Sequence, residues 1–258
     1  YGGLTEATRI LATSNPALLE PPNAEGVRRW LSTIAIIFFG VPVYPQAIQR
    51  IYAARSATTL RRSLQIMVFM PLVTTFFIFV IGIVAAANNS GLNRLESETV
   101  ILRVLANIVR DVPALGWIVA LFVAAVVAAI MSTVDSALLA ISSLVTQDLY
   151  RPGRPDASQA SLTRIGKITS WGIMGMTALL AIALPQTIWR LTEIKLEVLC
   201  QVAPALLFGI HLPGLRTRAV FSGLAAGTAL TLILMGANIL GADISTRPLG
   251  VHAGIWGL

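Results

Sequence analysis

The chain has 258 residues, of which 55% are hydrophobic and only 12% are charged, and its mean hydropathy is +0.77. Soluble domains carry about 25% charged residues, so this composition excludes an ordinary soluble domain. The formal net charge of +7 does not indicate nucleic-acid binding, because no basic patch is interleaved with aromatic residues. The single cysteine, Cys200, excludes an intrachain disulfide and a zinc-binding cysteine pattern.

Several segments are long and apolar enough to cross a bilayer, which takes about 20 residues of helix. Because a segment in lipid must satisfy its own backbone hydrogen bonds, the sequence predicts an all-α polytopic membrane protein. We predict one transmembrane domain over residues 1–258, with spans near 29–48, 64–87, 114–146, 163–184, 188–210 and 219–240. A seventh span opens near Val251, and the chain begins without methionine, so we expect an excerpt of a longer protein.

Basic residues are concentrated in alternate connections between these spans. Four arginines and no acid occupy residues 50–63, whereas the connection 88–113 balances its basic residues with acidic ones. Cytoplasmic loops are enriched in lysine and arginine, so we predict that 50–63, 147–162 and 211–218 face the cytoplasm from the plasma (inner) membrane of the cell. Arg28 and Arg29, at the outer end of the first span, run against this pattern.

The first span contains helix breakers close to its middle. Gly40, Pro42 and Pro45 lie within six residues, and each proline removes a backbone donor and clashes with the preceding turn. The spacing favours a broken helix over the alternative, a proline-kinked packing helix. Broken backbone at membrane depth lies inside protein or lines a cavity, and in secondary transporters it forms substrate and ion sites.

The third span carries a polar face in otherwise apolar helix. Ser132, Thr133 and Ser136 follow Ala129 at steps of three, four and seven residues, which places all four on one side. Asp135 is the only ionisable residue between 115 and 141, and a carboxylate at that depth indicates a functional site. Oxygen ligands on one face of a membrane helix suit a small hard cation, and sodium is the first such ion to consider. The alternative is hydroxyls that bond back to the carbonyl four residues earlier.

The fifth span contains acids near its predicted outer end. Glu193 and Glu197 are four residues apart on one face, which suggests an outer vestibule or ion pairs with Arg190. A helix that simply begins among the lipid headgroups explains them equally well. His211 and His252 are too few and too separated to predict a proton relay. No cation lies near the helix break, so the sequence does not nominate a carboxylate solute.

Four segments together resemble the sodium:solute symporter family. The resemblance is most specific in two of them, residues 45–56 with 60–63 and residues 128–143 with their continuation 147–150. It is weaker in residues 204–209 and 250–257. The resemblance covers essentially the whole chain. It implies the LeuT-type fold, in which two inverted five-helix repeats each begin with a broken helix. On this basis the chain is the second repeat plus a peripheral helix, 219–240, and the first repeat is absent.

The resemblance also implies site residues. The family's shared sodium site would here use the backbone carbonyl of Ala129 and the hydroxyls of Ser132 and Thr133. Some members hold a second sodium one turn along, so Asp135 and Ser136 are assigned to a second ion, to a proton, or to structural hydrogen bonding. We expect the solute to contact the helix break and one residue of the fifth span: Phe39, Gly40, Pro42, Tyr44, Gln46 and Gln201.

The predicted function is therefore sodium-coupled symport of a small organic solute, such as an amino acid or a carboxylate, by alternating access. The expected partners are sodium, the solute and the lipid bilayer, with no nucleic acid and no organic cofactor. We expect no enzyme activity, because no serine–histidine dyad, aspartate pair or zinc-binding helix is visible in the sequence. A channel or a sensor built on the same fold remains an alternative.

Overall fold

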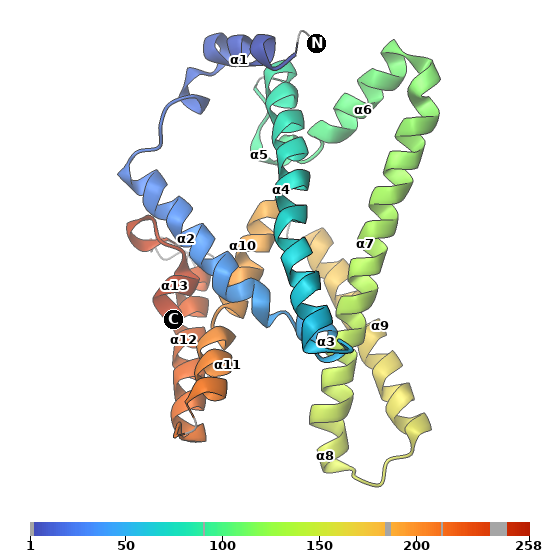
Figure 1. The fold of residues 1–258 in the computed structure, drawn as a ribbon, viewed down its shortest axis with the longest axis vertical. Coiled ribbons are helices and arrows are strands. Elements are labelled where there is room, and N and C mark those ends of the chain that lie inside the picture. Colours follow the sequence, from blue (N-terminus) through green and yellow to red (C-terminus); the bar gives the residue numbers. More distant parts are fainter. Residues whose placement is uncertain (1–2, 90, 184–186, 213, 238–246) are drawn as a thin grey trace. The chain divides into compact units, whose positions relative to one another are not determined.

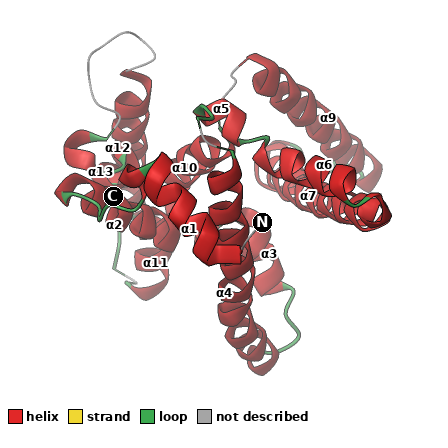
Figure 2. Cartoon of the chain, turned by 90° about the horizontal axis from the view of Figure 1, so that it is seen from above, coloured by secondary structure: helices red, strands yellow, loops and turns green. Residues whose placement is uncertain are grey.

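A computed structural model describes residues 3–89, 91–183, 187–212, 214–237 and 247–258. These ranges consist of helices and short connections, and no strand occurs in them (Figure 2). The α-helices are α1 Gly3–Ser14, α2 Ala24–Gly40, α3 Pro45–Tyr52, α4 Ala57–Asn88, α5 Arg94–Ser97, α6 Val100–Asp111, α7 Gly116–Leu144, α8 Arg151–Gly153, α9 Gln159–Ala183, α10 Ile188–Leu199, α11 Val202–His211, α12 Thr217–Ala237 and α13 Ala253–Gly257.

Six helical segments in the described part of the chain are long and apolar enough to cross a membrane. Each predicted span has a counterpart among them, but the ends differ. The second begins at Ala57 rather than at 64, because Ser56 caps it by accepting a hydrogen bond from the backbone N–H of Thr59 at 3.1 Å. Residues 238–240 of the sixth predicted span lie outside the described residues.

The chain divides into two compact units, residues 1–16 with 49–186 and residues 17–48 with 187–258. In the first, α7 contacts α9, and α1 packs on α4 through Ala7, Leu11 and Ala87 (Figure 1). The sequence analysis did not predict α1. On its exposed face, Arg9 donates a hydrogen bond to Glu6 at 2.6 Å, which holds the pKa of the Glu6 carboxyl below its ordinary value.

The second unit contains a small core in which α2 and α10 meet. Ile36, Leu196 and Cys200 are buried together. A Cβ atom on Gly40 would lie 3.0 Å from the side chain of Leu196 and 3.2 Å from its carbonyl oxygen. The missing side chain at Gly40 therefore allows α10 to cross α2 just where α2 ends.

The predicted break in the first span is present. α2 ends at Gly40, a 3₁₀ turn covers Val41–Val43, and α3 begins at Pro45. Tyr44, with φ −59° and ψ 125°, interrupts the helical backbone between them. The segment is therefore two helices joined by a non-helical residue, and a single kinked helix is excluded.

Candidate functional site

The polar face of α7 lies on an exposed part of the first unit. The hydroxyl of Thr133 donates to the carbonyl oxygen of Ala129 at 3.0 Å, and that of Ser136 donates to the carbonyl of Thr133 at 2.9 Å. The predicted alternative of a bond to the carbonyl four residues earlier is thus present at Thr133, whereas Ser136 bonds three residues back. A hydroxyl that donates its proton still has lone pairs for a ligand, so this geometry is compatible with cation binding.

The donor set on α7 fits a hard cation in part. Ala129, Ser132 and Thr133 contribute neutral oxygens within little more than one helical turn, as such an ion prefers. Three oxygens do not complete its coordination, so further ligands must come from another segment. Elsewhere in the described ranges, no cluster of three or more histidine, cysteine, aspartate or glutamate residues is arranged to hold a metal.

Asp135 is exposed on α7 and forms no hydrogen bond or ion pair with the described residues. Ser136 is half-buried and uses its proton on the backbone. The prediction for these two residues is therefore unchanged: they bind a second ion, bind a proton, or form structural hydrogen bonds.

The candidate solute residues 39–46 lie together because they flank the helix break. Phe39 and Tyr44 pack on the core of the second unit. The ammonium of Lys195 lies 5.0 Å from the centre of the Tyr44 ring, which is a cation–π contact. The sequence-based view that no cation lies near the break is therefore wrong. The reason is tertiary: Leu196 contacts Gly40, which brings its neighbour Lys195 to the break.

Gln201 is placed differently from the other candidate solute residues. Its side chain is buried, and its amide nitrogen donates to the carbonyl oxygens of Gly254 at 2.7 Å and Glu197 at 3.1 Å. No hydrogen bond joins its side chain to residues 39–46 in the described part of the chain. Gln201 ties the α10–α11 junction to α13.

A buried ion network lies in the second unit, and the sequence predicted only part of it. The predicted ion pairs with Arg190 are present, at 3.2 Å to Glu193 and 3.4 Å to Glu197. These carboxylates are 6% and 0% exposed, so they point into the protein and do not extend to solvent. Arg247 also pairs with Glu193, and His252 contacts Glu197.

Sequence reasoning missed the contribution of His252. Its ring is fully buried, with Nδ1 2.8 Å from Glu197 Oε1 and Nε2 3.0 Å from the hydroxyl of Thr33. The available signal was chemical rather than positional. A histidine in an apolar sequence needs buried partners, and Glu193 and Glu197 were candidate acids to which only Arg190 had been assigned.

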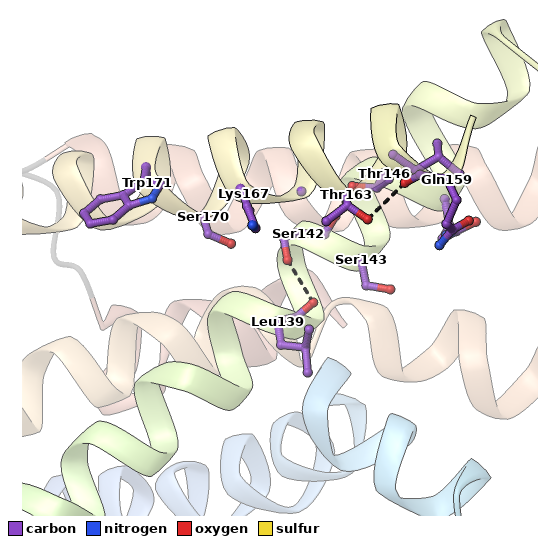
Figure 3. A pocket seen from close by; sticks show the side chains of 12 residues that line it. Leu139, Ser142, Ser143, Thr146, Gln159, Thr163, Lys167, Ser170 and Trp171 are labelled. Atoms are coloured by element: carbon purple, nitrogen blue, oxygen red, sulfur yellow. Dashed lines mark hydrogen bonds between the residues drawn. The ribbon is translucent and has the colours of Figure 1, made fainter. Parts of the chain in front are cut away.

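A polar groove of about 360 Å³ lies between the C-terminal end of α7 and α9 (Figure 3). It continues the polar stripe of α7 into the π-helix Val145–Tyr150. Several of its hydroxyls donate to backbone carbonyls, as Ser142 does to Leu139 at 3.1 Å. Lys167 forms no ion pair with the described residues and is the one cation in the lining, which consists of Leu139, Ser142, Ser143, Thr146, Gln147, Gln159, Leu162, Thr163, Gly166, Lys167, Ser170 and Trp171.

Comparison with known proteins decides the family. The model of the sodium:solute symporter family matches residues 1–227, which is most of the chain. The chain belongs to this family. No solved structure matches it.

Several curated relatives, all named as symporters, align with the chain over different lengths. An uncharacterized symporter of Bacillus subtilis, YodF, is 24% identical over 100% of this chain and 49% of its own length. The sodium/pantothenate symporter of Escherichia coli is 25% identical over 92% of the chain and 49% of its own length. The sodium/proline symporter of Salmonella typhimurium is 41% identical, over 26% of the chain and 13% of its own length. The chain thus spans about half the length of the first relatives it matches.

Family membership explains why a chain of this composition carries intramembrane polar groups. Symporters need ion and solute sites at membrane depth, and such groups mark transport pathways. In this family member they occur at three places, namely the exposed hydroxyls of α7, the break after α2, and the buried network that joins α10 to residues 247–252.

Proposed function

We propose that the whole protein is a sodium-coupled symporter of a small organic solute that works by alternating access. The observation that carries this proposal is the placement of the Ala129 carbonyl and the Ser132 and Thr133 hydroxyls on one face of an apolar helix in a family of sodium symporters. The proposed architecture is the LeuT-type inverted repeat. The spans up to α11 form the second repeat, and α12 is peripheral.

Sodium in this proposal binds the three α7 oxygens together with ligands from the part of the protein beyond this chain. Coupling requires that the ion binds the outward-open state more tightly than the other states. One sodium ion that moves inward through 100 mV contributes about 2.3 kcal/mol, before any concentration gradient is counted. Thr133 keeps its oxygen lone pairs for the ion, while its proton lies on the carbonyl oxygen of Ala129.

The solute in this proposal binds at the helix break, where Tyr44 and Gln46 offer hydrogen-bonding groups. The ammonium of Lys195, which has no ion-pair partner among the described residues, supports a solute with a carboxylate group. An uncompensated lysine in a membrane span is costly, and an anionic solute would offset that cost. Amino acids and simple carboxylates both meet this requirement.

The proposed location is the plasma membrane, with residues 50–63, 147–162 and 211–218 on the cytoplasmic side. On this topology α2 and α10 begin outside the cell. The distribution of arginine and lysine supports this orientation.

The test of sodium coupling is uptake by the full-length protein in proteoliposomes with an imposed sodium gradient. The double variant Ser132→Ala with Thr133→Ala is expected to lose sodium dependence. A matched control is Thr177→Ala on α9, because its hydroxyl is also exposed and also donates to a carbonyl four residues earlier, at 2.8 Å from Ile173. Unchanged sodium dependence in the double variant would reject the ion site.

A further inference from the structure

Five ionisable residues converge in the second unit and are shielded from solvent. Arg190, Glu193 and Glu197 come from α10, Arg247 precedes the 3₁₀ turn Pro248–Gly250, and His252 precedes α13. Their side chains are 0% to 24% exposed. Ionised groups at such burial persist only when their charges are compensated and their hydrogen bonds are made.

The two carboxylates are compensated unequally. Glu193 is paired with both arginines and also accepts a hydrogen bond from the indole N–H of Trp189 at 2.8 Å. Glu197 shares its Oε1 between Arg190, at 3.4 Å, and His252, at 2.8 Å. Its buried Oε2 has no hydrogen-bond partner among the described residues. Glu197 is therefore the carboxylate with the less complete set of partners in this network.

The hydrogen-bond partners of His252 allow two protonation states. An ionised Glu197 only accepts, so Nδ1 of His252 carries a proton. The hydroxyl of Thr33 lies 3.0 Å from Nε2 and 2.9 Å from the carbonyl oxygen of Arg29, and it has one proton to donate. If that proton goes to the carbonyl of Arg29, Nε2 donates a proton of its own to the Thr33 hydroxyl and the ring is cationic. If it goes to Nε2, that nitrogen accepts and the ring is neutral. The same heavy-atom positions satisfy both states.

We propose that the Glu197–His252 pair is a proton-binding site that makes transport depend on external pH. The proton resides on Nε2 of His252 or on Oε2 of Glu197, and the contact between Nδ1 and Oε1 joins the two groups into one site. A metal cation would bind poorly here, because the guanidinium of Arg190 already contacts Oε1 of Glu197, the oxygen that faces His252. On the proposed topology Glu197 lies in the external half of the membrane span Ile188–His211.

The charged and titratable groups around the pair come from each element packed on it. The face of α10 toward the pair contributes an arginine and two acids, one of them Glu197 itself, a thiol follows the last residue of α10, and the segment before the 3₁₀ turn contributes one arginine. At the start of α2 an arginine donates to the carbonyl of Leu249 at 2.9 Å, and an acid lies against Gly250. These groups are Arg190, Glu193, Glu197, Cys200, Arg247, Glu25, Arg28 and Arg29.

A direct path connects this site to the helix break. Thr33 and Ser32, which contact the ring and the backbone N–H of His252, lie on α2, and α2 ends at the break. Leu196, next to Glu197 in sequence, contacts Gly40. A change of one charge at the pair therefore acts on both helices that meet at the proposed solute site. Proton binding changes the transport rate when the proton binds one conformation of the transporter more tightly than another.

The first experiment rests on the proposed function and measures sodium-driven uptake by the full-length transporter at external pH values across about pH 5 to 8, where imidazoles titrate. Wild type and the matched control His211→Gln are expected to show an inflection. His211 is exposed, at the other end of α11. His252→Gln and Glu197→Gln are expected to lose it. An inflection retained in an active His252→Gln variant would overturn the proposal.

The second experiment does not need transport. Infrared difference spectra of the purified full-length protein between acid and neutral pH report proton uptake by imidazole and carboxylate groups. Bands present in wild type are expected to be missing in His252→Gln and displaced in Thr33→Val, which alters one partner of the ring and keeps the charges. Spectra identical in wild type and in both variants would reject the proton site. Bands without any sodium-driven uptake would keep the site and reject the proposed symport.

Discussion

The hydroxyl face of α7 and the ion network around α10 both place polar groups in apolar helices, yet they are stabilised in opposite ways. On α7, Thr133 and Ser136 bond to backbone within one turn and the face is exposed. Around α10, Glu197 is fully buried and its partner His252 is 55 residues away in sequence. The first arrangement leaves oxygens available to an external ligand. The second uses its polar atoms to join segments of the same chain.

The largest expected effect comes from removal of a charge in the buried network. Glu197→Ala leaves Arg190 and His252 facing a cavity without their carboxylate, and breaking a buried pair in this way costs about 3–5 kcal/mol of unfolding free energy. Thermal and denaturant unfolding of the full-length protein in detergent would measure it. Asp135→Ala is the matched control on α7, because that carboxylate is exposed and has no described partner. Equal stability losses in the two variants would show that the polar groups of α7 and of α10 contribute alike to stability, contrary to the comparison above.

A smaller effect is expected from close packing beneath the network. A Cβ atom on Gly254 would lie 2.7 Å from Glu197 Cα and 2.9 Å from Cys200 Sγ, so Gly254→Ala forces α13 away from α10. Overpacking of this kind costs about 1–3 kcal/mol. The same unfolding measurement applies, and Gly172→Ala on α9 is the control, because no atom lies within 4 Å of its added Cβ. A stable Gly254→Ala variant would mean that α13 is not held at this distance.

The helix break stands between the two regions, since it combines local backbone chemistry with one tertiary contact. If Lys195 binds a carboxylate solute, Lys195→Gln should raise the apparent Kd for that solute about tenfold, or about 1.4 kcal/mol, and leave uncharged competitors unaffected. Lys195→Arg should restore most of the affinity. Lys167→Gln, in the groove between α7 and α9, is the control. Equal weakening of charged and uncharged solutes would show that Lys195 only supports the fold.

The features that sequence predicted are those whose causes are local. The break follows from Gly40, Pro42 and Pro45, and the α7 face from the helical period of its hydroxyls, so both were readable without tertiary contacts. The role of His252 and the approach of Lys195 to Tyr44 depend on how α10 crosses α2 and α13. That crossing is set by glycines whose neighbours the sequence does not reveal. Helix α4 begins seven residues before the predicted span, because its cap, Ser56, lies in a basic segment that reads as a loop.

The smallest expected effect on stability separates the remaining roles of Asp135. Because its side chain is exposed and forms no described hydrogen bond or ion pair, Asp135→Asn should change the unfolding free energy by no more than about 0.5 kcal/mol. Its effect on the sodium dependence of uptake then carries the information. A steeper requirement for sodium with normal stability would assign the carboxylate to an ion, whereas a shift in pH dependence alone would assign it to a proton. A stability loss of several kcal/mol would instead mean that Asp135 is buried against the rest of the full-length protein. The contrast between the exposed face of α7 and the buried network around α10 would then hold only within this chain.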